Sequence, residues 1–323
     1  MELTKRLLQA ALLLLLFQPM KLWPQQPFSP KGEVHTPTGD LHMLVIFVRY
    51  ENASRMSSQR EWPDVSVEGV LPEMAMGEPN ALFCADPQRL GRERMRNLSD
   101  YYYAMSGGAF RITADIFPIQ VPVKYVPETG ANFFSRQEKM NQAAVTWIAQ
   151  NYPDFDWSRY DRRKNHPGFV QDNSASVPDG ILDYVVFMHR EFGSTGMGSS
   201  GGIAIPGSTL RIQDGHTGIR SYADAAHNWE YFKHEFAHNL YNCPHYLGAN
   251  NADGNRFYTQ KGWGLMSAWH APFFSANAWE CWWLGWLEPQ QVSKNDRYYL
   301  RDFVTGRDAI RIQLPGTQDV LWI

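Results

Sequence analysis

The segment 41–50 (LHMLVIFVRY) constrains the fold of this chain more than any other feature. It is a continuous apolar run with several β-branched residues, which is typical of a strand covered on both faces. Further strands are predicted at 110–117, 119–123 and 183–189. We expect an α/β (α+β) fold with a mixed sheet.

Two helices are predicted between these strands. Apolar residues recur at helical spacing over 90–105, and the pattern stops at a Ser-Gly-Gly sequence typical of a helix end. The second helix is predicted to start at the capping-box pair Ser135 and Glu138 and to run to about Asn151. Its inner stripe is Met140, Ala144, Trp147 and Ile148.

A longer helix is predicted over the segment from Ser221 to Tyr241, opened by the pair Ser221 and Asp224. Apolar residues repeat along this segment at intervals of four, three, four and four. The predicted buried stripe consists of Ala225, Trp229, Phe232, Phe236 and Leu240.

The pentapeptide HEFAH in this segment carries the predicted chemistry. Histidines at 234 and 238 lie one helical turn apart, so both imidazoles can bind one metal ion, and Glu235 projects beside them as a general base. His234 and His238 each stand about 200° round the helix from Phe236, so the ligand face is opposite the buried stripe. The pattern predicts a zinc site, and the alternative is an ordinary helix with two solvent-facing histidines.

A third ligand is expected shortly after the helix. Asn242 and Pro244 predict that the helix ends there and that the chain turns back, which could bring His245 to the same metal ion. Cys243 is the competing ligand. It is otherwise a small buried residue or one half of a disulfide bridge to Cys281.

The sequence GWGLMS places Met266 in a tight turn flanked by glycine, roughly thirty residues after the helix, as in the Met-turn of metzincins. Such a methionine forms an apolar floor under the histidines and is not itself a ligand. Three more residues in this part of the chain could stabilise an oxyanion, although a place in the cleft wall is the simpler role: Tyr246, Tyr258 and His270.

Several segments together resemble the immune inhibitor A family of secreted zinc metallopeptidases. They are HEFAHNLYNCPHYLG, GWGLMSAW, AWECWWLGWLEP, LSDYYYAMSGGAFRITADIFP and PDGILDYVVF. The resemblance extends from about Leu41 to the end of the chain and implies a metzincin-like α/β catalytic domain with an active-site helix. It also implies that His234 and His238 are the first two zinc ligands, Glu235 the general base and Met266 the Met-turn residue.

The chain departs from the family pattern near the third ligand. Tyr241 stands where the family has glycine, one residue is inserted, and His245 follows Pro244 where an acidic ligand is usual. Only a short spacer precedes Leu41, which leaves little room for the propeptide that family members carry. The resemblance also suggests Ca²⁺ as a second cofactor, and the candidate oxygen ligands are Asp172, Asp179, Asp183, Asp253 and Asn255.

The start of the chain predicts export. Lys5 and Arg6 precede an apolar run to Phe17 that is too short to span a bilayer, so residues 1–26 are expected to form a signal peptide without stable membrane insertion. A secreted, periplasmic or cell-surface location follows. The chain carries 30 Lys and Arg against 33 Asp and Glu, a net charge of −3, so a nucleic-acid partner has no electrostatic basis.

The remaining boundaries follow from these segments. We expect a proline-rich spacer at 27–40, a catalytic domain at 41–288 and the start of a C-terminal β segment at 289–323, with strands at 309–314 and 320–323. An apolar strand at a chain end is unusual, which predicts that the natural chain continues beyond Ile323.

The predicted function is a secreted zinc endopeptidase acting on protein or peptide substrates. One alternative is an adhesion or glycan-binding protein with a degenerate protease fold and an exposed tryptophan surface. Asn277 and Glu280 predict a capped helix that ends at Gly285. Tryptophans at helical spacing are more often core residues than an exposed sugar-binding surface, which argues against this alternative for Trp279, Trp282, Trp283 and Trp286. The other alternative is a zinc hydrolase of a non-peptide bond such as an ester.

Overall fold

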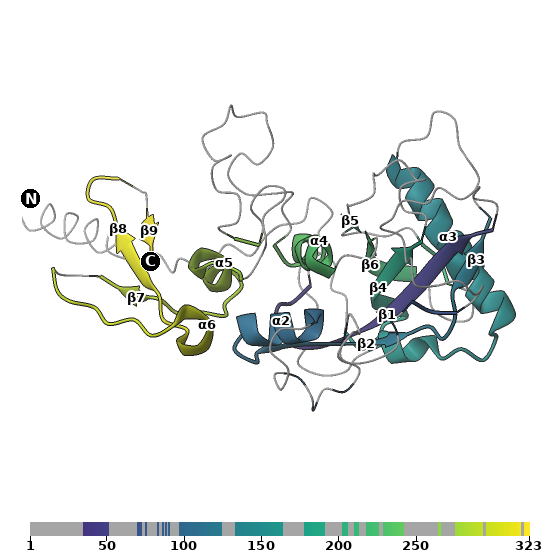
Figure 1. Cartoon of the computed structure of the whole chain (residues 1–323), viewed down its shortest axis with the longest axis horizontal. Helices are drawn as coiled ribbons and strands as arrows, with labels where there is room; N and C mark the ends of the chain where they lie inside the picture. Colours follow the sequence, from purple (N-terminus) through teal and green to yellow (C-terminus); the bar gives the residue numbers. More distant parts are fainter. Residues whose placement is uncertain are drawn as a thin grey trace, which may run out of the picture.

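The computed structural model describes thirteen segments and five single residues of the chain. The segments are 35–51, 70–72, 97–124, 133–163, 178–190, 202–205, 210–212, 218–225, 229–241, 264–265, 275–292, 295–317 and 320–323, and the single residues are 75, 83, 86, 88 and 90. Helix α3 lies on one side of the main sheet and helices α2 and α4 lie on the other, with a small second sheet at the far end (Figure 1).

The described strands of the main sheet run in the order β2-β1-β4-β6-β5, and β3 pairs with β1 beyond the end of β2. The β1, β2, β3, β4 and β6 strands are parallel, whereas β5 is antiparallel to β6. This arrangement confirms the predicted α/β class. The strand bounds are β1 Gly39–Tyr50, β2 Phe110–Ile116, β3 Val121–Val123, β4 Ile181–His189, β5 Gly202–Ile205 and β6 Gly218–Ala225.

Strand β1 is buried on both faces, as its apolar run predicts. The odd-numbered residues from Leu41 to Phe47 pack into a core with α2, α4 and α5, while Leu44, Ile46 and Val48 pack into a second core under α3. The central strand therefore separates two apolar layers, and the side of the sheet that carries α4 also carries the candidate site.

Helix α2 (Leu98–Met105) covers only the end of the predicted 90–105 helix. Asn97 explains its start, because the Asn97 side chain accepts the backbone N–H of Asp100 and caps the first turn. The chain leaves the helix through Gly107 and Gly108, which adopt positive φ angles of 64° and 84°. The predicted glycine terminator is therefore confirmed.

Helix α3 (Phe133–Asn151) ends at the predicted residue but begins earlier than predicted. Ser135 lies inside the helix, so its assignment with Glu138 as an N-terminal capping box is wrong. Neither residue 133 nor residue 134 is a glycine or proline that would stop the helix, and a Ser-x-x-Glu pattern occurs in helix interiors as well as at their ends. Of the predicted inner stripe, Met140, Ala144 and Ile148 are buried and Trp147 is partly buried.

The prediction of one helix over Ser221–Tyr241 is wrong. The structure divides this segment into strand β6 and helix α4 (Trp229–Tyr241). Ser221 and Asp224 are strand residues, because β6 fills the position between β4 and β5 and pairs with both. Pairing with distant strands outweighs the local helical pattern. Ala225 also belongs to β6, whereas Phe236 and Leu240 are buried on α4 as predicted.

The last part of the described chain forms a second sheet in the order β7-β8-β9. Helix α5 (Ala278–Trp283) precedes it and begins with the predicted capping box of Asn277 and Glu280. Gly285 ends this segment with a φ of 73°. The remaining bounds are β7 Gln290–Gln291, α6 Phe303–Gly306, β8 Ile310–Gln313 and β9 Val320–Trp322, so strands are found within both predicted C-terminal segments.

Arg307 joins this C-terminal part to the main body. Its guanidinium donates to the carbonyl oxygens of Ala104 and Met105 at the end of α2 and to that of Trp286. One side chain thereby ties α2, the segment after α5 and the turn before β8 together.

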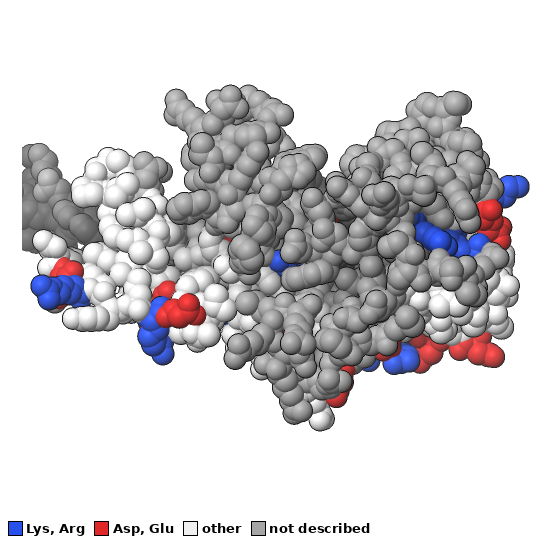
Figure 2. Space-filling model, viewed as in Figure 1, with Lys and Arg blue, Asp and Glu red and all other residues white. Residues whose placement is uncertain are grey.

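The described surface has no long run of one charge on the face that Figure 2 draws, where blue and red side chains lie near one another. Within the described segments, no helix is long and apolar enough to cross a membrane.

Candidate metal centre

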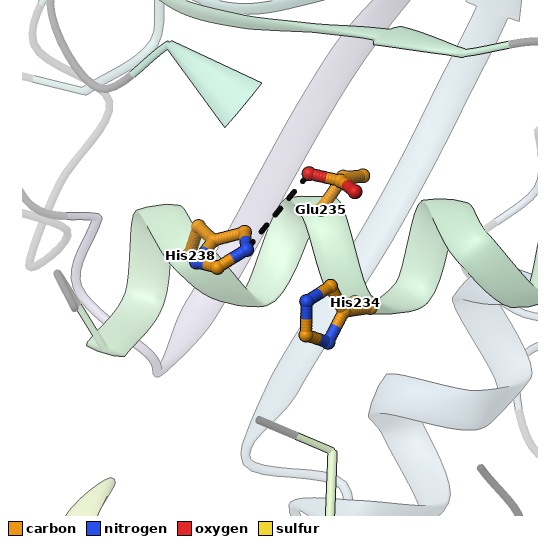
Figure 3. A group of neighbouring side chains, drawn as sticks. All are labelled: His234, Glu235 and His238. Carbon is orange, nitrogen blue, oxygen red and sulfur yellow. Dashed lines mark ion pairs between the residues drawn. The ribbon is translucent and has the colours of Figure 1, made fainter. Parts of the chain in front are cut away.

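Helix α4 brings His234, Glu235 and His238 together. Phe236, Ala237 and Leu240 of the same helix are fully buried in the core, which holds the helix in a single orientation against the sheet. The two imidazole rings lie one turn apart with centroids 4.6 Å from each other (Figure 3). One potential ligand atom from each of the three residues lies within 4.8 Å of the others.

The ring of His234 is oriented by the backbone of Leu265. Nδ1 lies 2.6 Å from the Leu265 carbonyl oxygen, and a carbonyl can only accept a hydrogen bond, so Nδ1 carries the proton. Nε2 is then the unprotonated nitrogen. A metal-binding histidine normally donates the N–H of its other ring nitrogen to an acceptor such as a backbone carbonyl. In His234 that nitrogen is Nδ1, so Nε2 is the candidate ligand atom.

Glu235 is largely withdrawn from solvent, since its side chain is 13% exposed. Burial raises the pKa of Glu235 to about 8, because an ionised carboxylate is poorly solvated there. Its Oε2 lies 3.9 Å from Nε2 of His238, which is too long for a hydrogen bond, so this neighbour offsets the burial only weakly. Without a cation the protonated carboxyl is favoured at neutral pH.

The donor set is compatible with zinc. Two imidazoles beside a carboxyl group are typical of the HExxH zinc site, and the hydrogen bond of His234 Nδ1 to a backbone carbonyl is the contact that zinc-binding histidines commonly make. No second group of three or more such side chains is found among the residues that the structure describes.

The other predicted site residues lie outside the described residues, namely His245, Met266, Tyr246, Tyr258, His270 and the competing ligand Cys243. Leu265, the neighbour of Met266, is described and fully buried, and its carbonyl contacts His234. The segment predicted to form the Met-turn therefore reaches the site at that residue.

Leu265 and Glu280 are site residues that the sequence analysis missed. Glu280 was assigned only to a helix cap, but its Oε2 also accepts the backbone N–H of Leu265 at 2.9 Å. Leu265 and His234 are 31 residues apart in the sequence, and no local pattern connects either of them with Glu280.

Two of the calcium ligands proposed from sequence, Asp179 and Asp183, lie among the described residues. Asp183 accepts the backbone N–H groups of Arg162 and Arg163, and Asp179 accepts that of Ile181. Both carboxylates therefore accept hydrogen bonds from backbone N–H groups. Asp172, Asp253 and Asn255 lie outside the described residues.

Cys281 is a free, buried cysteine, so the bridge to Cys243 is not formed. Its Sγ lies 3.8 Å from the carbonyl oxygen of Met105. Burial raises the pKa of this thiol to about 12, which makes it an unreactive core residue.

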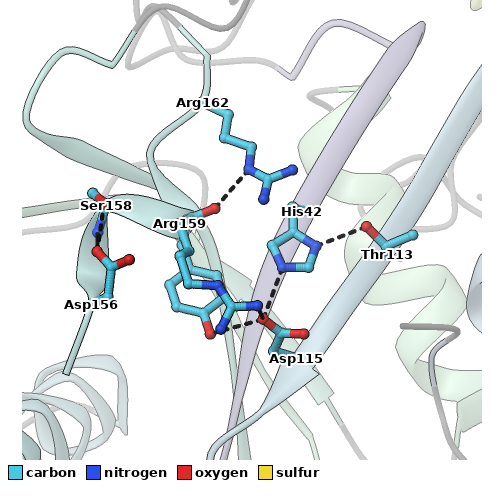
Figure 4. Close-up of polar contacts among 8 residues, drawn as sticks. His42, Thr113, Asp115, Asp156, Ser158, Arg159 and Arg162 are labelled. Carbon is cyan, nitrogen blue, oxygen red and sulfur yellow. Dashed lines mark hydrogen bonds and ion pairs between the residues drawn. The ribbon is translucent and has the colours of Figure 1, made fainter. Parts of the chain in front are cut away.

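A second polar cluster lies on the opposite face of the sheet, between β1, β2 and the 3-10 helix η3 (Trp157–Tyr160) (Figure 4). His42 contacts Thr113 Oγ1 through Nδ1 at 2.8 Å and Asp115 Oδ2 through Nε2 at 3.1 Å. Tyr160 stacks on His42 and donates its hydroxyl to Asp115, which also pairs with Arg159. Thr113 is buried, so this Asp-His-Thr arrangement joins the strands and offers no accessible nucleophile. Burial lowers the pKa of His42.

The fold and the site together define an α/β protein with a His-Glu-His group on a helix beside a largely parallel sheet. No protein-family model matches the chain, and no curated protein matches it.

Proposed function

We propose that this chain is a secreted zinc-dependent endopeptidase. The observation that carries the proposal is the grouping of His234, Glu235 and His238 on α4, in which Nδ1 of His234 is bonded to the Leu265 carbonyl. His245 is proposed as the third protein ligand on the sequence argument alone. The resemblance to the immune inhibitor A family supports the same activity.

Glu235 is the proposed general base. When bound, Zn²⁺ supplies Lewis-acid activation of a water molecule and of the scissile carbonyl. Glu235 accepts the proton of the attacking water and then returns it to the leaving amine. Glu235 lies in one group with the two proposed zinc ligands, so the same carboxyl group could serve in both steps.

Strand β5 favours a peptide substrate over a small ester. Among the described strands β5 pairs only with β6, and we propose that an extended substrate chain adds along its other side. Strand β5 also packs next to α4, which carries the site. A peptide added along this edge would satisfy its own backbone groups and pass the proposed zinc ligands.

The tryptophan-rich segment gives less support to a glycan-binding protein. Trp286 is buried, and the Arg311 guanidinium lies over the rings of both Trp282 and Trp322, 5.5 and 5.8 Å from their centroids. Aromatic faces that already contact a guanidinium are not free to stack on sugars.

Incubation of the full chain with casein, with and without a zinc chelator, tests the proposed activity. We expect chelator-sensitive cleavage that falls about 10²- to 10⁴-fold in the Glu235→Gln variant while its zinc content stays unchanged. Glu288→Gln is the matched control, because Glu288 is exposed and distant in sequence from the HEFAH segment. Cleavage by Glu235→Gln at the rate of the parent would disprove the mechanism, and chelator-sensitive cleavage of esters alone would favour the non-peptide hydrolase.

Export is tested separately. Expression of the full chain in a secreting host should release a protein whose new N-terminus, read by mass spectrometry, falls within residues 19–27. Retention of residues 1–17 in the released protein would contradict a cleaved signal peptide.

A further inference from the structure

The peptide groups of Leu265 connect two side chains from different helices. The Leu265 carbonyl oxygen accepts Nδ1–H of His234 on α4 at 2.6 Å, and the Leu265 N–H donates to Oε2 of Glu280 on α5 at 2.9 Å. Leu265 and Glu280 are fully buried and His234 is nearly so. The three residues form a continuous hydrogen-bonded path that solvent does not interrupt.

Glu280 does more in this path than cap its helix. Its Oε2 accepts the backbone N–H of Asn277 at 2.7 Å, as a capping box requires, and the same atom accepts the Leu265 N–H. A capping box can form at the protein surface, so helix capping alone gives no reason to bury a carboxylate completely. The second bond, to a residue 15 positions earlier, accounts for the burial.

A carboxyl group on the N–H side of Leu265 affects His234 through the backbone. It determines where the Leu265 backbone lies, and hence where the carbonyl meets the imidazole. The same oxygen also accepts the Asn277 N–H, so the carboxyl group that meets Leu265 is itself fixed to α5.

We propose that Glu280 is a positioning residue for His234: through Leu265 it holds the imidazole in the Nδ1–H form and directs Nε2 toward the metal. The effect on metal affinity rests on the proposed function, whereas the effect on the imidazole does not. Residues that orient metal-binding histidines commonly change metal affinity 10- to 100-fold when they are replaced.

The test compares Glu280→Ala with Asn277→Ala in the full chain. Both substitutions break the same capping box, because Asn277 Oδ1 accepts the Glu280 N–H, but only the first removes the bond to Leu265. We expect Glu280→Ala to lower Zn²⁺ affinity 10- to 100-fold, measured by competition with a chromophoric chelator. Asn277→Ala should lower it less than about threefold, and Glu280→Gln, which keeps an acceptor oxygen, should fall between them.

Imidazole nitrogen shifts of the metal-free protein at pH 8 give a readout that needs no metal. The signal assigned to His234 should report the Nδ1–H form in the parent and in Asn277→Ala, and a mixture of both neutral forms in Glu280→Ala. Should Glu280→Ala not fold, the comparison is made with Glu280→Gln.

Two results would overturn the proposal: equal loss of zinc affinity in Glu280→Ala and Asn277→Ala, or an unchanged His234 signal in the Glu280 variant. A parent chain that binds no zinc would refute the proposed function, and the nitrogen shifts would still decide the role of Glu280.

Discussion

The ring of Phe236 meets the ring of Tyr184 edge-on, with centroids 5.0 Å apart and an interplanar angle of 87°. Tyr184 belongs to β4, and its hydroxyl accepts a hydrogen bond from Asn239 one turn further along α4. One tyrosine of the sheet therefore holds α4 at two points that flank Ala237 and His238. The position of the candidate metal ligands depends on this aromatic contact.

Replacing Phe236 with alanine should weaken both stability and metal binding. Removing a fully buried phenylalanine leaves a cavity against Tyr184, Tyr102 and Phe110 and should lower the free energy of unfolding by about 3–5 kcal/mol. Denaturant unfolding measures this. Leu321→Ala, at an exposed position, is the control and should change stability by less than about 0.5 kcal/mol. Equal effects of the two substitutions would contradict the anchoring role of Phe236.

Arg163 should be essential for the segment that leads into β1. Its buried guanidinium donates to the carbonyl oxygens of Thr36, Thr38 and Asp40. Arg163→Met removes the donor of these three hydrogen bonds and the positive charge near the buried Asp183. The loss should lower the free energy of unfolding by about 3–5 kcal/mol. Arg301→Met, at an exposed ion pair with Asp308, should leave the thermal unfolding midpoint nearly unchanged. A similar small shift for Arg163→Met would show that the guanidinium is dispensable.

The metal-free protein should become less stable as the pH rises toward 8, because of Glu235. Burial raises the pKa of this carboxyl from 4.5 to about 8, so between these values the folded state holds the proton more tightly than the unfolded chain. Stability is therefore lost with rising pH. Glu235→Gln has no proton to lose, and its stability relative to the parent should increase by about 4 kcal/mol from pH 4.5 to pH 8. The free energy of unfolding of both chains is measured against pH by urea unfolding in the presence of a chelator. If the two profiles run parallel, the titration of Glu235 does not contribute to the pH dependence of stability.

Two glycines with positive φ should respond differently to alanine. Gly285 has a φ of 73° with nothing within 4 Å of an added Cβ, so Gly285→Ala should destabilise by about 1 kcal/mol from backbone strain alone. Gly107 has a φ of 64°, and an added Cβ would lie 3.0 Å from the Arg307 side chain, which holds the end of α2. Gly107→Ala should therefore cost more, about 2–3 kcal/mol. Thermal unfolding of both variants measures the two losses of stability. Equal losses would mean that the Arg307 side chain moves aside freely and adds nothing to the cost at Gly107.

The fold was predictable where local patterns determine it. The apolar run of β1 and the capping box of α5 both depend on residues within a few positions of one another, and both are found as predicted. Strand β6 was missed because its conformation depends on pairing with β4, whose partner residues lie more than thirty positions away. Within the segment Ser221–Tyr241 nothing local marks that change.

The same distinction applies to the candidate site. The grouping of His234, Glu235 and His238 follows from helical spacing alone, and the structure brings them together. The contacts of Leu265 with His234 and Glu280 depend on how α4 and α5 pack, which periodicity does not encode. Hence the grouping of the candidate metal ligands could be predicted from the sequence, while the contacts of Leu265 with His234 and Glu280 could not.

The pairing of β1 with β4 has a consequence for biosynthesis. Strand β1 leaves the ribosome early, yet its neighbour on one side begins only at Ile181. At a typical synthesis rate of 5–20 residues per second, the nascent segment 41–50 waits on the order of ten seconds for β4. During that interval the edge of β1 that later pairs with β4 lacks its partner, so a chaperone that binds short apolar segments should protect newly made chains from aggregation.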